Sequence, residues 1–566
     1  GDPLAAALAA GEIPAPEVVA AAGPIEGMHP AMAFSAFLAF LLMIGVAAFL
    51  AQQVNLIERV DMAKPPAVLL DRARELVAEL GWPAKPKDEA SWFGYDGQVL
   101  RYLDDPDAAG VEQDWKRLDA GPSPVKFYYR SSPEPMRDLG NGVSLQTPAP
   151  VVPGMITLAL DPTGRLSSFS AVPVDGISAE DLPPSLDWPE VFAAAGLDPR
   201  DFQESLEPLL APPVFADQRL AWDGAYAATP EIPLAVEAAS YLGRPVYFRA
   251  GQPRPLAPPE RQGAVPWLIF TSLILLGGIV LAWRNLRLGR GNMKGAIQVA
   301  SFVFVSRALV WFLVGHFPNG AAEAFDALTT QVAYALFVGV FTWVYYLALE
   351  PYVRRAWPEA LIPWSRLLTG RLSDPLVGRD ILVGGLWGMS MVALGCLRRM
   401  APEWLRWTPE QPDLVFMEPL YGVAATIGRT VSLAGDSVLA AMILVFLLVA
   451  FRVILRRTWL AELAWLLAIS AAVLAILGSS GAELIGSNVA FGLVWAGSLL
   501  FLIVRFGLLA SAVGLFFAMI FATMPVSAEI DQWYFPVTLM VAAVAVFLGS
   551  WGLRNALAGR PLIAVR

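Results

Sequence analysis

The chain has 566 residues, of which 56% are hydrophobic and 16% are charged, and its mean hydropathy is +0.53. Soluble domains carry about 25% charged residues, so a large part of this chain is expected to lie in lipid. The net charge of −10 argues against a nucleic-acid partner, which requires a basic face. The single cysteine, Cys396, excludes a disulfide within one chain and a cysteine-based metal cluster.

Ten apolar segments are predicted to cross a membrane as helices. A bilayer core of about 30 Å requires roughly 20 apolar residues in a helix. The segments are residues 31–51, 266–283, 295–315, 326–349, 381–397, 431–451, 461–478, 488–504, 508–525 and 536–553. The last segments are separated by only a few residues, so counts of nine or eleven stay open. The first segment is interpreted as an uncleaved anchor rather than a signal peptide, because no basic residue precedes it.

Connectors that contain arginine and lysine alternate along the chain with connectors that lack them. This pattern predicts the orientation of the helices in the membrane. The basic connectors are 284–294, 349–380 and 452–457, while the connectors near residues 316–325, 479–487 and 526–535 contain neither arginine nor lysine. Residues 398–430 disagree, because this connector should lie outside but contains four arginines. The pattern places both termini and the arginines of 349–380 in the cytoplasm, at the lipid headgroups, with Trp357 and Trp364 at the interface.

Residues 1–30 are interpreted as a cytoplasmic linker, and residues 52–265 as an extracytoplasmic α+β domain before the polytopic region 266–566. A helix is predicted from Pro66 to Gly81, a strand at 125–132, and a hairpin turning at 161–164. A second helix near 188–195 and a hairpin at 232–250 repeat the order of helix and hairpin. This order is similar to that of PepSY-like modules. The predicted fold is therefore a multi-pass α-helical membrane protein of about ten spans with an α+β cap containing a duplicated helix–hairpin unit.

The chain lacks the residues that common catalytic sites require. The two histidines, His29 and His316, are predicted at opposite faces of the membrane, and neither can serve Cys396. No cluster of metal ligands and no kinase motif is present, so the chain is predicted to have no catalytic, cofactor-binding or metal-binding residues.

Four charged residues within or at the ends of the spans are candidate functional residues: Arg307, Asp436, Glu462 and Arg505. Charges in the membrane are costly and tend to face protein or water. Arg307 and Asp436 form a buried pair in one interpretation. In the other, Arg307 extends outward to the headgroups while Asp436 lies near them.

Several strings resemble the membrane region that follows the catalytic domain in large bacterial serine/threonine protein kinases of the Acidobacteria type. The resemblance runs from Gly1 to roughly residue 400 and is looser beyond; its strings are "GDPLAAALAAGEIPAPEVVAAAG", "RARELVAELGW", "VPGMITLALDPTGRL", "VEAASYLGRPVYF", "WRNLRLGRGNMKGA" and "LEPYVRRAWPEALIPWSRLLTGRLSDPLVGRD". It implies that a cytoplasmic kinase domain, with its ATP and Mg²⁺ sites, precedes Gly1.

The leading hypothesis is therefore a sensor and anchor of a bacterial inner-membrane kinase, not itself an enzyme. Its expected partners are the bilayer, the upstream kinase domain and an unidentified extracytoplasmic ligand or protein; oligomer formation is left open. The alternatives are a stand-alone transporter and an accessory subunit of a membrane complex.

Overall fold

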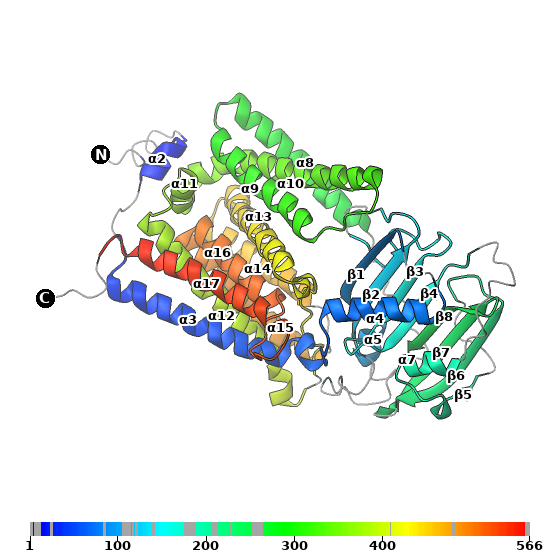
Figure 1. Ribbon diagram of the computed structural model, residues 1–566. Helices are drawn as coiled ribbons and strands as arrows, with labels where there is room; N and C mark the ends of the chain where they lie inside the picture. The colour runs from blue at the N-terminus through cyan, green and yellow to red at the C-terminus, as the bar shows by residue number, and fades with distance from the viewer. Residues whose placement is uncertain are drawn as a thin grey trace.

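The computed structural model describes residues 4, 13–22, 27–82, 86–104, 115, 118, 123–137, 142–174, 188–205, 212–226, 229–251, 264–407, 409–477 and 482–560. A domain built on one β-sheet lies at one end of a bundle of long helices (Figure 1). The chain enters this domain from α3 (Pro30–Val54), through η1 (Leu56–Arg59), and returns to the bundle at α8 (Ala264–Arg287). This arrangement agrees with the predicted multi-pass helical protein carrying an α+β domain.

Within the described ranges, eight helices are long and apolar enough to cross a membrane. They are α3, α9 (Met293–Val314), α10 (Ala321–Ala356), α12 (Pro375–Leu405), α13 (Val423–Leu455), α14 (Thr458–Leu477), α15 (Ala482–Phe506) and α17 (Phe535–Ala556). The other two predicted spans correspond to α8 and to α16 (Leu508–Thr523), a shorter apolar helix. The count of ten spans stays a prediction.

All eight strands of the sheet pair antiparallel, in the order β1-β2-β3-β4-β8-β7-β6-β5. They are β1 (Asp88–Tyr95), β2 (Val125–Ser132), β3 (Ile156–Leu160), β4 (Leu166–Ala171), β5 (Gln203–Glu204), β6 (Gln218–Tyr226), β7 (Thr229–Tyr241) and β8 (Arg244–Gly251). The two predicted hairpins are β3–β4 and β7–β8, and they lie side by side in the middle of the sheet. Leu242 and Gly243 have φ of 51° and 75°, as a type I′ hairpin turn requires.

Each half of the sheet follows a helix. Helix α4 (Pro66–Glu79) precedes β1–β4, and α7 (Trp188–Ala194) precedes β5–β8; α5 (Gly97–Asp104) is inserted after β1. The predicted repeat of helix and hairpin is thus a repeat of helix and four strands. The buried stripe of α4, including Leu69 and Leu76, packs with Phe192 of α7 against the same apolar core of the sheet.

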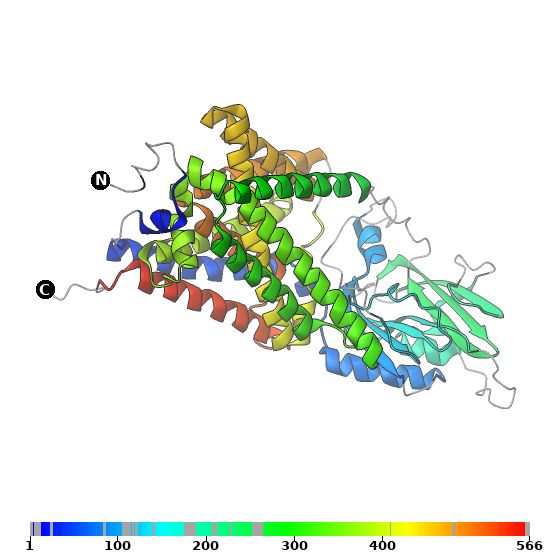
Figure 2. The ribbon, with the colours of Figure 1, turned by 90° about the horizontal axis from the view of Figure 1, so that it is seen from above.

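The connectors separate into two groups at the two ends of the bundle. Residues 315–320, 409–422 and 524–534 lie at the end that carries the sheet domain, where they contact it. The basic connectors meet at the other end: Arg354 donates to the carbonyl of Arg290, and the Arg452 guanidinium lies 4.7 Å from the Trp357 ring. The start of α3 and the end of α17 also lie at this second end (Figures 1 and 2).

For two arginines of the segment 349–380, and for Trp364, the expected place at the headgroups and the interface was wrong. Arg354 and Arg366 do not reach the lipid headgroups but are 3% and 1% exposed, and Trp364 is 4% exposed. Their partners lie within the protein: Arg354 is beside Glu350 at 3.4 Å, and Arg366 binds Asp374 at 2.9 Å. The segment contains η4 (Pro358–Leu361) and α11 (Ile362–Leu368), which pack into the bundle and cover these side chains.

Three of the four arginines of the disagreeing connector have local side-chain partners. Arg398 lies 2.7 Å from Glu410, and Arg399 lies 2.5 Å from Asp413. The Arg429 guanidinium lies 3.2 Å from the Phe416 ring centroid. Arg406 ends α12 in the left-handed conformation, with φ of 57°. Three of these arginines are thus held by side chains at the sheet-domain end, which accounts for their presence in this connector.

Candidate functional site at the junction of sheet domain and helices

The predicted residues Arg307 and Asp436 lie together between α9 and α13. The Arg307 guanidinium donates to an Asp436 carboxylate oxygen and, at 2.8 Å, to the hydroxyl of Ser432. The two side chains are 19% and 35% exposed. The geometry is that of a pair bridging two helices, and not that of an arginine extended away from the aspartate.

The other two predicted residues do not join this pair. Glu462, near the start of α14, accepts a hydrogen bond of 2.8 Å from Arg452 at the end of α13. Arg505 is exposed at the end of α15, and its guanidinium lies 5.7 Å from the ring of Phe506. Three of the four residues therefore belong to two separate ion pairs, the second of which Glu462 forms with Arg452, and Arg505 is a surface arginine.

The sheet domain is attached to the bundle through backbone and side-chain hydrogen bonds at the end of α3. Leu56 N–H donates to the carbonyl of Asp413 at 2.9 Å, and Asp413 N–H donates to Val54 at 2.8 Å. The hydroxyl of Tyr95 on β1 donates to the Val415 carbonyl at 2.8 Å and accepts from the Val415 N–H at 2.9 Å. The connector between α12 and α13 thus runs as an extension of the sheet domain.

Aromatic rings fill the space between the two parts. The ring of Phe93 on β1 stacks on Trp533 at 6.2 Å and meets Tyr421 edge-on at 5.9 Å. The Trp533 indole N–H donates to the carbonyl of Met62 at 2.6 Å. Val415, Met417, Leu420 and Tyr534 belong to the same apolar core as the inner face of the sheet. The sheet domain and the helix connectors therefore share one core.

Glu58 of η1 is the ionisable group at the centre of this junction. Its carboxylate accepts hydrogen bonds from Tyr534 at 2.9 Å and from Ser527 at 3.1 Å. Burial raises the pKa of Glu58, and the two hydroxyl donors only partly oppose that effect. A carboxylate in this position links α3 to the connector before α17.

A second contact joins the start of β1 to the connector between α9 and α10. Asp88 is 6% exposed, and it lies 3.2 Å from His316 while accepting the N–H of Met136 at 2.7 Å. Asn319 donates to the carbonyl of Lys87 at 3.1 Å. His29 lies at the other end of the bundle, at the start of α3, so the two histidines are separated as predicted.

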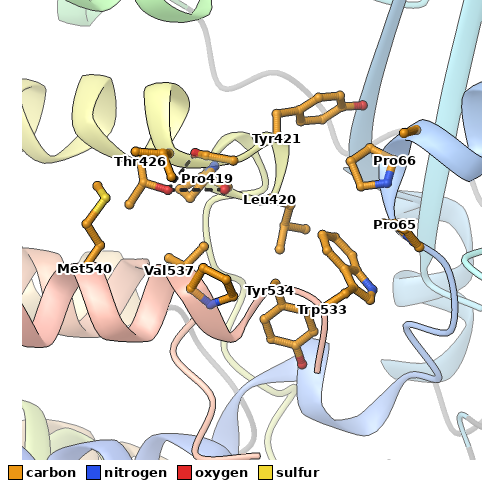
Figure 3. A pocket seen from close by; sticks show the side chains of 14 residues that line it. Pro65, Pro66, Pro419, Leu420, Tyr421, Thr426, Trp533, Tyr534, Val537 and Met540 are labelled. Atoms are coloured by element: carbon orange, nitrogen blue, oxygen red, sulfur yellow. Dashed lines mark hydrogen bonds between the residues drawn. The ribbon is translucent and has the colours of Figure 1, made fainter. Parts of the chain in front are cut away.

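A pocket of about 320 Å³ lies within the junction (Figure 3). Pro65 and Pro66 close it from the sheet domain, and Tyr421, Trp533 and Met540 close it from the bundle. Its walls are mainly apolar, and it lies where α4, α13 and α17 begin. A ligand in this pocket would contact both the sheet domain and two membrane helices.

At the opposite end, Arg366 binds the N-terminal segment to the bundle. Helix α2 (Pro16–Ala21) ends beside α11, where Arg366 donates to the carbonyls of Ala20 at 3.1 Å and Ala22 at 2.7 Å. A guanidinium suits the free carbonyls at a helix C-terminus. Val19 is fully buried in the bundle core. This described part of the expected linker is therefore packed against the helices.

Sequence reasoning did not identify Glu58, Val415 or Trp533 as junction residues. The available signals were the aromatic residues flanking β1 and the string "DQWYF" before the last span. Phe93 of β1 and Tyr129 of β2 lie in the core and are 4% and 1% exposed.

In the ranges that the structure describes, no group of three or more histidine, cysteine, aspartate and glutamate side chains is placed to hold a metal ion. Comparison of the chain with family models, with curated proteins and with solved structures finds no match.

Proposed function

We propose that this chain is the sensor and anchor region of a serine/threonine protein kinase in a bacterial inner membrane. In this proposal the sheet domain lies outside the cell, and a kinase domain that binds ATP and Mg²⁺ precedes Gly1 in the cytoplasm. The resemblance of the sequence strings to such kinases supports this function. The pocket at the junction is the proposed site of the extracytoplasmic ligand.

The observation that carries the proposal is the continuous packing from the sheet domain to the N-terminal segment. The shared core holds the sheet domain against the ends of α3, α13 and α17. Helix α3 then spans the bundle toward the segment that contains α2, which Arg366 holds against α11. A change in the position of the sheet domain against the helices would thus be transmitted to the end of the bundle where a kinase domain would be attached.

The experiment uses the protein encoded by the whole reading frame, reconstituted in liposomes with ATP and Mg²⁺. Loosening the junction with Trp533→Ala is expected to change the rate of autophosphorylation, whereas Trp404→Ala, at an exposed site, is expected to leave it unchanged. A reading frame without a kinase domain before Gly1 would refute the proposal. An unchanged rate in Trp533→Ala would refute the sensor role and leave only anchoring.

The Arg307–Asp436 pair favours one second candidate, a transporter with an extracytoplasmic cap. Paired charges between membrane helices are typical of ion and proton pathways. In proteoliposomes with an entrapped pH-sensitive dye, a transporter of this kind would show proton flux that Asp436→Asn abolishes. Equal flux in the variant and the parent protein would remove the pair from consideration.

A further inference from the structure

A second pocket, of about 220 Å³, lies among the ends of α3, α12, α14, α15 and α16 that face the sheet domain. Its apolar wall includes Met391, Leu477, Phe491 and Trp495. These four side chains are only half-buried, so the pocket is reached from the surface of the bundle. Sites for whole small molecules are larger, about 300–1,000 Å³, so this volume suits one part of a long amphipathic ligand.

The rim of the same pocket is charged. Arg398, Arg399 and Asp413 line it beside the apolar wall. The Arg398 side chain is 7% exposed, and its Nη1 donates to Glu410 and to Asn488, both at 2.7 Å. Its buried Nε–H has no acceptor among the described residues. Arg398 therefore brings a guanidinium to the lining of the pocket, and one of its N–H groups has no partner among the described residues.

The charges at the rim cancel. Arg398 and Arg399 carry two positive charges and Glu410 and Asp413 two negative ones, and Arg399 contacts both carboxylates, at 3.5 Å and 2.5 Å. An added anion would leave this buried cluster unbalanced, whereas a ligand with one charge of each sign would not. Burial raises the pKa of Asp413 despite the nearby arginines, so a further cation would stabilise its carboxylate.

We propose that this pocket binds a zwitterionic phospholipid whose headgroup ends in a primary ammonium, as in phosphatidylethanolamine. The phosphate pairs with the Arg398 guanidinium, the ammonium donates to Asp413, and the upper part of one acyl chain lies along Phe491 and Trp495. A choline headgroup has no N–H to donate, so the site distinguishes the two common zwitterionic lipids. The proposal is independent of the kinase assignment.

The test measures the lipid retained by the purified full chain. The protein is delipidated in mild detergent, mixed with phosphatidylethanolamine, phosphatidylcholine or phosphatidylglycerol of identical acyl chains, and examined by native mass spectrometry. Phosphatidylethanolamine is expected to bind at least about tenfold more tightly than the other two, because the others lose a charge-assisted hydrogen bond. Equal binding of all three lipids, or preference for the anionic lipid, would overturn the proposal.

Two glycines provide a matched pair of variants. A Cβ at Gly395, which lines the pocket, would meet only the Phe491 ring at 3.9 Å, and a Cβ at Gly497 would meet only Leu466 at 3.8 Å. Both glycines lie within helices and are half-buried. Gly395→Leu is expected to fill the pocket and abolish the selective retention, whereas Gly497→Leu is expected to keep it. Selective retention by folded Gly395→Leu would refute this location.

The unmodified protein offers a readout that needs no variant. Cys396 is the sole cysteine and lines the pocket. Its alkylation by N-ethylmaleimide is expected to slow when phosphatidylethanolamine is added to the delipidated protein, and not when phosphatidylcholine is added. An alkylation rate that responds to neither lipid, or equally to both, would contradict the assignment even if Gly395→Leu fails to fold.

Discussion

Tyr95 and Val415, which are 320 residues apart in the chain, are joined by two hydrogen bonds through one phenolic hydroxyl. The hydroxyl serves the N–H and the carbonyl of the same residue, and Val415 is 2% exposed. Tyr95→Phe leaves both backbone groups buried without that partner, so we expect a loss of about 1–3 kcal/mol in the stability of the junction. Thermal unfolding in detergent should show a lower midpoint. Tyr247→Phe, at a half-buried tyrosine of β8, is the control and should change the midpoint little.

Glu58 is expected to make the junction more stable at mildly acidic pH than at neutral pH. Its folded-state pKa is raised by burial, so the folded protein binds a proton at Glu58 more readily than the unfolded chain does. The favourable contribution is present below the unfolded pKa and is lost as the pH rises through the folded pKa. Glu58→Gln should remove this dependence and raise the unfolding midpoint at neutral pH.

The Glu58 measurement compares the unfolding midpoints of parent and variant between about pH 5 and pH 7.5, a range in which carboxyl groups of raised pKa titrate. Glu79→Gln, on the exposed face of α4, is the matched control and should follow the parent protein. A difference between parent and Glu58→Gln that does not vary with pH would contradict the prediction.

Arg366 is expected to hold α2 in place, and lysine is not expected to replace it. One guanidinium serves the carbonyls of Ala20 and Ala22 and both oxygens of Asp374, a geometry that a single ammonium does not reproduce. In Arg366→Lys, hydrogen exchange of the α2 amides should speed up by at least about tenfold. Arg371→Lys is the control, because Arg371 is exposed and lies 3.4 Å from the Ala20 carbonyl. Equal exchange in the two variants would contradict this role.

Removal of one member of the Arg307–Asp436 pair is expected to destabilise the protein more than removal of both members. Asp436→Asn leaves the partly buried Arg307 without its counter-charge, and such a change typically costs about 3–5 kcal/mol when a buried pair is broken. The double variant Arg307→Met, Asp436→Leu should recover much of the loss. Unfolding midpoints of the single and double variants decide this, and a double variant less stable than Asp436→Asn would count against it.

The proposed orientation is tested by labelling introduced cysteines from outside the cell. Val151 in the sheet domain and Leu372 in the basic connector are 71% and 50% exposed, so both sites are accessible to a reagent. In a Cys396→Ala background, a membrane-impermeant maleimide should label Val151→Cys in spheroplasts and Leu372→Cys only after permeabilisation. The reverse pattern would place the sheet domain in the cytoplasm and remove the sensor proposal.

Local sequence patterns were sufficient for those elements whose signals lie within a few residues. Pro66 and Gly81 predicted the bounds of α4, and the string from Asp161 to Gly164 predicted the β3–β4 turn. The edge strands were missed: β5 has two residues, and β1 places Trp92 and Phe93 side by side without a clear alternation of apolar and polar residues.

The sequence by itself determined that the chain contains long apolar helices and one α+β domain. It also showed which connectors between the helices are basic and which are not. Helix length, turn chemistry and arginine content are properties of short segments, which the sequence displays directly. Only the tertiary structure decided which charges are paired and where the sheet domain is attached. Arg366 with Ala20, and Tyr95 with Val415, are far apart in the chain, and their contacts depend on the packing of entire helices.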